Sequence, residues 1–198
     1  MKRFGFALIS LLCIVAVSPA GLVSLSGVDL LTDYDAGTGV LAINDTAAVT
    51  IEESTSIQTT VTGADIQLST TLSADNSVGG MASGLFTGGS LSFVDSSGST
   101  LLEGTINQIA IGEVFDGMGL LAGTGDFQVT GGSLASEFPD ALGEIVQLSF
   151  NVSPTTISDY TTDFSARTNL SLMPVPEPAT IAMLGLGGLA LLRRKKSA

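Results

Sequence analysis

Aspartates near the start of the chain are the side chains whose type and spacing come closest to a chemical site. Asp29, Asp33 and Asp35 lie close together and are followed by Gly37 and Gly39. Hard cations such as calcium favour carboxylate oxygens, and glycine lets a loop turn sharply around an ion. The segment therefore raises the hypothesis of a calcium-binding loop.

The calcium-loop pattern of an EF-hand fails in this segment. A loop that starts at Asp33 places Thr38 where a glycine is required and Asn44 where the closing glutamate should be. Aspartate and glycine are also common in ordinary turns, because both tolerate the backbone angles that turns need. We interpret residues 33–41 as a solvated hairpin, and we predict no metal site and no cofactor.

Catalytic groups are scarce in the chain. Histidine is absent, and the only cysteine, Cys13, lies in the N-terminal apolar segment. A Ser-His-Asp triad and a zinc or copper centre therefore cannot be built. A carboxylate pair for glycoside hydrolysis stays open, but tryptophan is absent, and Tyr34 and Tyr160 are the only tyrosines that could stack on a sugar. We predict no catalytic residues and no enzymatic activity.

The region between the two ends of the chain is strongly acidic. Arg167 is its only cation between residues 21 and 175, where eighteen of the nineteen acids lie, so the formal charge of this body is −17. Such a surface repels phosphate backbones and anionic lipids, which excludes a nucleic-acid partner. We expect Arg167 to pair with Asp163 or with another surface acid.

Alternating polar and apolar residues predict strands through the whole body. No apolar stripe with helical spacing runs there for more than about two turns. Apolar side chains rich in Val, Ile and Phe recur at every second position, as in half-buried strands, at residues 49–51, 66–70, 90–93, 126–130 and 145–152. The core candidates on these and neighbouring segments are Phe86, Phe93, Phe127, Val129, Leu148 and Phe150.

Glycine clusters lie between these segments and predict tight turns, since glycine reaches positive φ without strain. They occur at residues 79–80, 88–89, 117–119, 123–125 and 131–132. The element Gly-Gly-Ser-Leu at 88–91 and again at 131–134 predicts two similar strand–turn–strand units of one sheet. We predict an all-β fold, a single antiparallel β-sandwich or jelly-roll-like domain over residues 21–172.

The N-terminal residues predict a secretory signal peptide over residues 1–20. A short basic start at Lys2 and Arg3 precedes the apolar run 4–17, and Ala20 ends a stretch of small residues where cleavage is expected. The apolar run is too short to favour a permanent membrane helix. Cys13 follows Leu12, whereas a lipoprotein signal would place a small residue there, so we interpret Cys13 as part of the apolar run.

The C-terminal residues 173–198 contain three signals in a fixed order. Pro174 precedes the motif Pro176, Glu177 and Pro178, and these prolines keep the strip extended, because proline fixes φ and restricts the residue before it. An uncharged apolar run at 179–192 then predicts a short helix, which is shorter than the roughly 20 residues of a comfortable membrane span. Four cations end the segment and would hold it at the cytoplasmic side: Arg193, Arg194, Lys195 and Lys196.

Together these signals resemble the PEP-CTERM sorting tail of exported bacterial proteins. The resemblance implies recognition by a membrane-embedded exosortase, cleavage near the Pro-Glu-Pro strip, and a Gram-negative host that makes exopolysaccharide. It implies transient residence in the inner membrane through the C-terminal helix and then a place at the cell surface or in the extracellular matrix. The expected partners are the secretion machinery, the exosortase and exopolysaccharide.

Three functions remain open for the body of the chain. The first, which we favour, is an exported structural protein of the cell surface or exopolysaccharide matrix without catalytic activity. The second is a glycan-binding or calcium-dependent adhesin-like module, which a concave face with several aromatics would favour. The third is an extracellular carbohydrate-active enzyme, which two close carboxylates at the foot of a cleft would favour.

Overall fold

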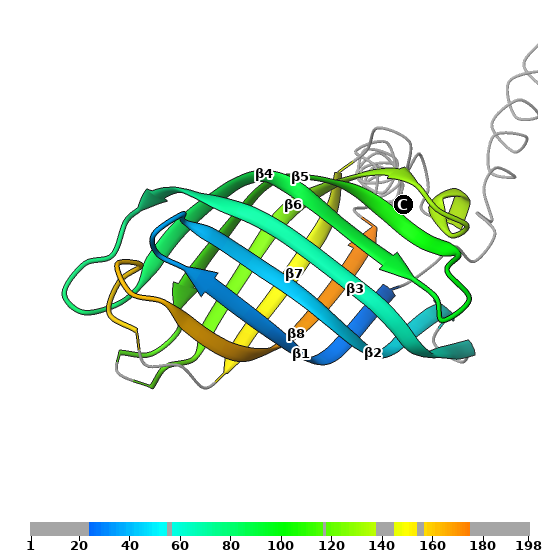
Figure 1. Cartoon of the computed structure of the whole chain (residues 1–198), viewed down its shortest axis with the longest axis horizontal. Coiled ribbons are helices and arrows are strands. Elements are labelled where there is room, and N and C mark those ends of the chain that lie inside the picture. Colours follow the sequence, from blue (N-terminus) through cyan, green and yellow to red (C-terminus); the bar gives the residue numbers. More distant parts are fainter. Residues whose placement is uncertain (1–23, 55–56, 117, 138–144, 154–156, 175–198) are drawn as a thin grey trace, which may run out of the picture.

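The fold consists of eight antiparallel strands, seen in a computed structural model that describes residues 24–54, 57–116, 118–137, 145–153 and 157–174 (Figure 1). The strands follow one another along the chain as β1 Ser24–Asp35, β2 Val40–Ser54, β3 Ile57–Asp75, β4 Ser83–Val94, β5 Thr100–Glu113, β6 Leu121–Gly131, β7 Ile145–Ser153 and β8 Phe164–Pro174. One short 3-10 turn, η1 Ala135–Glu137, follows β6. The predicted all-β antiparallel class and the five predicted strands are confirmed.

The strands form a single sheet that closes on itself. Each strand pairs with the next one along the chain, and β1 also pairs with β8, so the sheet is a closed barrel. The prediction of a β-sandwich or jelly roll is therefore wrong, because both of those architectures need two packed sheets. Alternation along a strand requires only one buried face, and the inside of a barrel supplies it as well as a sandwich does.

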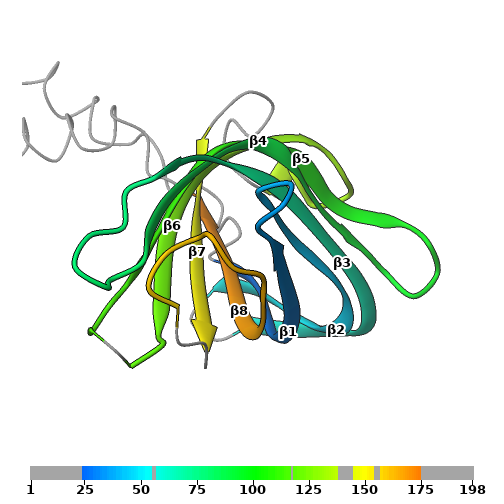
Figure 2. The ribbon, with the colours of Figure 1, turned by 60° about the vertical axis from the view of Figure 1, so that its left-hand side comes forward.

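The up-and-down order gives the barrel two different ends (Figures 1 and 2). We call the end with the connections β1–β2, β3–β4, β5–β6 and β7–β8 the loop end. At the other end, the terminal end, β1 begins and β8 finishes, and Leu25 pairs directly with Leu172. Both ends of the described chain therefore leave the barrel at neighbouring positions.

The inside of the barrel is filled by the apolar side chains that alternate along the strands. Phe86, Phe93 and Phe127 have no exposed surface, and Val129 is buried as well, so four of the six predicted core residues are confirmed. The other two, Leu148 and Phe150, lie on β7, whose side chains are outside the described part of the chain. Two buried polar side chains, Thr32 of β1 and Thr168 of β8, meet where these strands pair. The Thr32 hydroxyl donates a hydrogen bond to the Thr168 hydroxyl at 2.6 Å, so neither is left without a partner.

Glycine clusters lie either in turns or inside strands, and the sequence pattern did not distinguish these two roles. Gly79 and Gly80 form the predicted turn, with φ of 66° and 90°. The clusters 88–89 and 123–125 lie inside β4 and β6 instead of between strands, so the two predicted turns are wrong. At Gly89, Gly123 and Gly125 the backbone of the neighbouring strand lies too close for a Cβ atom, which explains why glycine occupies these strand positions.

The glycine pair inside β4 forms a bulge against β3. Gly88 and Gly89 have φ of 68° and 105°, and the β3–β4 register shifts between Ser69 and Thr71. A Cβ atom on Gly89 would lie 1.8 Å from the Ser69 carbonyl oxygen. The Thr70 hydroxyl donates to the Gly88 carbonyl oxygen at 2.8 Å, which satisfies a backbone group beside the bulge.

Aromatic rings close the loop end from inside. Tyr34 packs edge-on against Phe86 and Tyr160 and stacks on Phe164, with ring centroids 5.2–6.1 Å apart. The Tyr160 hydroxyl donates to the Ile111 carbonyl oxygen at 3.2 Å, and the Tyr34 hydroxyl donates to the Tyr160 carbonyl oxygen at 3.0 Å. These contacts fasten the β7–β8 connection across the barrel.

A glycine on β4 makes room for this ring cluster, which gives the first prediction. A Cβ atom on Gly84 would lie 2.7 Å from Tyr160 Cε2 and 2.9 Å from Leu72 Cδ1. We expect Gly84→Ala to lower the free energy of unfolding, measured by chemical denaturation, by about 1–3 kcal/mol, because the rings must shift. Gly112→Ala on the neighbouring strand is the matched control, since its Cβ would meet nothing closer than 3.6 Å. Equal losses in both variants would contradict the tight fit at Gly84.

The second prediction concerns alkaline pH. Burial raises the pKa of Tyr160 above its usual value of 10.0, and the nearby Asp75 adds to the rise. The unfolded chain ionises this group near pH 10 and the folded chain does not, so its stabilising contribution is complete below pH 10 and is lost as the pH rises further. We expect the free energy of unfolding of the wild type to be nearly constant from pH 8 to pH 9 and to fall as the pH rises above about 10.

The variant Tyr160→Phe isolates this contribution. It removes the hydrogen bond to Ile111 and should cost about 1 kcal/mol at pH 8, while flattening the alkaline decline. Tyr34→Phe is the control and should keep the part of the decline that belongs to Tyr160. An unchanged pH dependence in Tyr160→Phe would refute the assignment.

Candidate acidic site at the loop end

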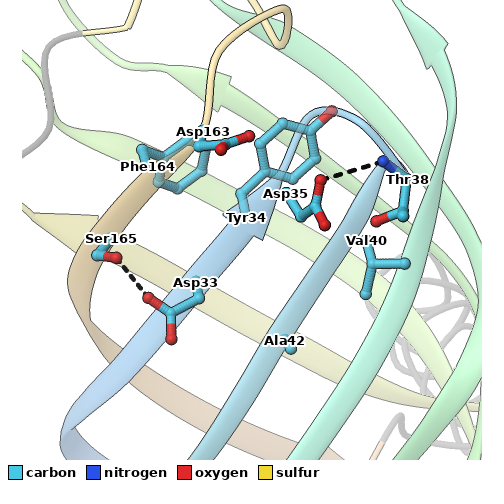
Figure 3. A pocket seen from close by; sticks show the side chains of 9 residues that line it. All are labelled: Asp33, Tyr34, Asp35, Thr38, Val40, Ala42, Asp163, Phe164 and Ser165. Atoms are coloured by element: carbon cyan, nitrogen blue, oxygen red, sulfur yellow. Dashed lines mark hydrogen bonds between the residues drawn. The ribbon is translucent and has the colours of Figure 1, made fainter.

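A pocket of about 610 Å³ lies beside the first hairpin, at the loop end of the barrel (Figure 3). Its lining combines three carboxylates with hydroxyls and small or apolar side chains: Asp33, Tyr34, Asp35, Thr38, Val40, Ala42, Asp163, Phe164 and Ser165. The residues come from β1, the β1–β2 turn, β2, the end of the β7–β8 connection and the start of β8. Segments more than 120 residues apart in the sequence therefore meet at this place.

Strand alternation explains why the acids lie together. Tyr34 points into the barrel and is buried, so Asp33 and Asp35 on either side of it point outward and are exposed. The register sets Asp33 opposite Ser165 of β8, and Tyr34 opposite Phe164. Asp163, just before β8, thereby joins the two predicted acids at the pocket (Figure 3).

Each carboxylate of the pocket already accepts hydrogen bonds from the protein. Asp35 Oδ1 accepts from the backbone N–H groups of Gly37 at 2.8 Å and Thr38 at 3.1 Å, which shapes the hairpin turn. Asp163 Oδ1 accepts from the N–H of Ala36 at 2.8 Å, and Asp33 Oδ1 accepts from the Ser165 hydroxyl. The acids therefore hold the first hairpin against the entry to β8, and the predicted hairpin at 33–41 is confirmed.

Asp29, the third aspartate of the predicted cluster, lies elsewhere. It occupies the irregularity of β1 between Gly27 and Leu30 and has a φ of 59°, a left-handed conformation that aspartate tolerates better than most residues. Arg167 donates to its carbonyl oxygen at 2.8 Å, and the two side chains approach to 3.8 Å. The calcium hypothesis brought together three acids, and the fold brings together only two of them.

Arg167 pairs with acids of the barrel wall. Its second partner is Asp45 at 3.6 Å, so the expected partner Asp163 is wrong and the expected alternative, another surface acid, is confirmed. The pKa of Asp45 lies below its usual value, mainly because the carboxylate accepts from the N–H groups of Leu31 and Thr46, with Arg167 contributing less. Exposed ion pairs of this kind add little stability by themselves.

The chemistry available to the pocket is limited. Among residues 24–54, 57–116, 118–137, 145–153 and 157–174, no group of three or more potential ligand side chains is arranged to hold a metal ion. A general acid for glycoside cleavage needs a carboxyl that stays protonated through burial, whereas Asp33, Asp35 and Asp163 are all exposed. The pocket can offer negative charge and hydrogen-bond acceptors to a polar ligand.

The pocket residues 163–165 at the entry to β8 were missed from the sequence in this role. Asp163 was considered only as a partner of Arg167, and Phe164 was not considered at all. No local pattern links them to the first hairpin, since the connection depends on the pairing of β1 with β8. They could have been found only by predicting that β1 pairs with β8 and closes the sheet into a barrel.

The predicted sorting and cleavage residues lie outside the described part of the chain. This holds for Ala20, for Pro176, Glu177 and Pro178, and for the four C-terminal cations. The last described residue, Pro174, ends β8 and pairs with Val146 of β7. Within the described ranges, no helix has the length and apolar character to cross a membrane.

Comparison with known families identifies the C-terminal segment. Residues 174–196 match the PEP-CTERM protein-sorting motif, which confirms the resemblance. The motif implies an exported protein that interacts with and is processed by an exosortase. Comparison with curated proteins finds no match, and comparison with solved structures finds none either.

The third prediction concerns calcium at the acidic pocket. Because the three carboxylates are committed to backbone and hydroxyl donors, we expect calorimetric titration of the purified protein to show no stoichiometric site of sub-micromolar affinity. Any heat from weak, non-stoichiometric calcium binding should be the same in Asp33→Asn and Asp35→Asn as in the wild type. Asp65→Asn on the wall of β3 serves as control. A tight site that disappears in the first two variants alone would show that the pocket is a calcium site.

Proposed function

We propose that the protein is a structural component of the cell surface or exopolysaccharide matrix and has no catalytic activity of its own. An exosortase processes the exported chain at its sorting tail, and the barrel is the part that is delivered. The observation that carries the proposal is the position of the sorting motif, which begins at residue 174 where β8 ends. The barrel and the sorting signal therefore follow each other without a linker.

The outer wall of the barrel supports a structural role. Its exposed positions carry many hydroxyl side chains, among them Ser69, Thr71, Ser73, Thr87, Ser90, Thr105, Thr124 and Thr130. Such a convex, hydroxylated wall suits a hydrated matrix. The apolar side chains of the described strands form one buried cluster inside the barrel, in which Phe86, Phe93 and Phe127 are fully buried.

A glycan-binding or cation-dependent adhesin is the second candidate, and the acidic pocket is the observation that favours it. Asp33, Asp35 and Asp163 offer acceptors beside the half-buried ring of Phe164, a combination that suits hydroxylated ligands. A carbohydrate-active enzyme is the third and least supported candidate, because the exposed acids lack a buried proton donor. Glycan arrays probed with the purified protein, with and without calcium, separate the first candidate from the second.

The fourth prediction tests the processing. Protein recovered from the surface fraction of the native host should lack both the segment up to Ala20 and the tail after the Pro-Glu-Pro strip. Intact-mass spectrometry measures both ends at once. If the recovered protein still ends at Ala198, the tail is an ordinary membrane anchor and the proposal fails.

Two tail variants separate recognition from retention. Alanine at Pro176, Glu177 and Pro178 removes the extended strip, so an unprocessed, membrane-held precursor should accumulate. Neutral residues in place of Arg193, Arg194, Lys195 and Lys196 should instead weaken retention in the membrane during export. Immunoblots of membrane and surface fractions distinguish the two outcomes.

A further inference from the structure

Exposed apolar side chains gather at one corner of the loop end. Nine large hydrophobic residues in the described part of the chain are exposed, and five of them belong to the β3–β4 and β5–β6 connections. We call these five the apolar tip: Val78, Met81, Val114, Phe115 and Met118. Phe115 is 59% exposed and Met118 is 71% exposed, although burial of such side chains is worth about 25 cal/mol per Å².

The register of β4 and β5 makes the apolar tip continuous. Ser83 pairs with Gly112, and the N–H of Glu113 donates to the Ala82 carbonyl oxygen at 2.8 Å. The next residues outward, Met81 and Val114, are therefore neighbours. Val78 and Met81 form a bridge across the tight turn, and cross-strand partners present their side chains on the same face.

Backbone hydrogen bonds hold both connections in place. In the β5–β6 connection, Val114 N–H donates to the Leu120 carbonyl oxygen at 2.9 Å, and Met118 N–H donates to that of Phe115 at 3.1 Å. Glu113 Oε1, on a side chain that is only 8% exposed, accepts from Gly119 N–H at 3.1 Å. At the described residues of the two connections, the exposed side chains thus stand on hydrogen-bonded backbone, which lowers the entropic cost of binding a partner.

The charges around the apolar tip select the partner. Asp116 lies between Phe115 and Met118, and Asp75 begins the β3–β4 connection. Asp159 is close enough to Asp75 to act on it electrostatically. Arg167, the only cation in the described part of the chain, is on the wall with Asp29 and Asp45. A second copy of this acidic body would be repelled, whereas a basic partner would be attracted.

We propose that the apolar tip is a docking site for a basic segment of another protein that also presents apolar side chains. Phe115, Met118 and Val78 fill the apolar contacts, since aromatic and methionine side chains are common at interface centres. Asp75 and Asp116 attract the cations of the partner from the rim. This inference does not depend on how the sorting tail is processed.

The fifth prediction uses a defined probe. A synthetic amphipathic peptide with lysines on one face and leucines on the other is titrated into protein purified from the native host, with fluorescence anisotropy as readout. The wild type should bind this peptide. The double variant Phe115→Ser, Met118→Ser should bind about tenfold more weakly or worse, as expected for the loss of two central apolar contacts.

The matched control places the same change elsewhere on the surface. Val28→Ser on β1 and Ile57→Ser at the terminal end remove side chains that are 56% and 53% exposed, and they should leave the affinity within about twofold, a small change in free energy. Thermal unfolding checks that all variants stay folded. A peptide with glutamates in place of the lysines should not bind.

Four outcomes would overturn the proposal. Absence of peptide binding to the wild type would refute it, and equal affinity in the double and control variants would show only diffuse charge attraction. Binding of the wild type to zwitterionic phosphatidylcholine vesicles, lost in the double variant, would assign the apolar tip to a lipid surface. Self-association lost in the double variant, measured by sedimentation, would assign it to a second copy of the chain.

Discussion

The pairing of β1 with β8 is the constraint on which the rest of the structure depends. It joins residues such as Leu25 and Leu172, which lie near the two ends of the barrel's sequence. Without it, two long strands would expose their backbone groups at open edges, and the apolar inner face would lose its enclosure. The buried hydrogen bond from Thr32 to Thr168 lies at this seam, so the interior places a polar contact where the two ends of the sheet meet.

Acidic side chains at the loop end serve the fold before they serve any ligand. Asp35 shapes the first turn, Asp163 holds that turn against the entry to β8, and Asp75 accepts from the N–H of Tyr160 at 3.2 Å. A strongly negative body can therefore keep its connections ordered, since its carboxylates are matched with backbone donors where cations are scarce. The same use of the acids explains why their density in the sequence is a poor guide to a metal site.

Local features were predictable from the sequence, and closure was not. Alternation located five of the eight strands, and the Asp-rich segment at 33–41 is the predicted hairpin, because both depend on neighbours along the chain. Gly88 and Gly89 look like turn residues, yet they form a bulge, since what decides their role is the approach of Ser69 from β3. The acidic pocket was half predicted for the same reason. Asp33 and Asp35 share a strand face by spacing alone, whereas Asp163 reaches them only through the β1–β8 register.

The position of β8 also sets the order of events during biogenesis. Contacts between residues far apart in the sequence form slowly, because the entropy of closing a long loop is lost before the contacts stabilise the chain. The last contacts of this barrel need the strand that ends at Pro174, so the sheet cannot close until nearly all of the body has crossed the membrane. A chain that stays open during passage is easier to thread through a narrow channel. The sorting signal that follows at once would then reach its enzyme at about the moment when the barrel becomes able to fold.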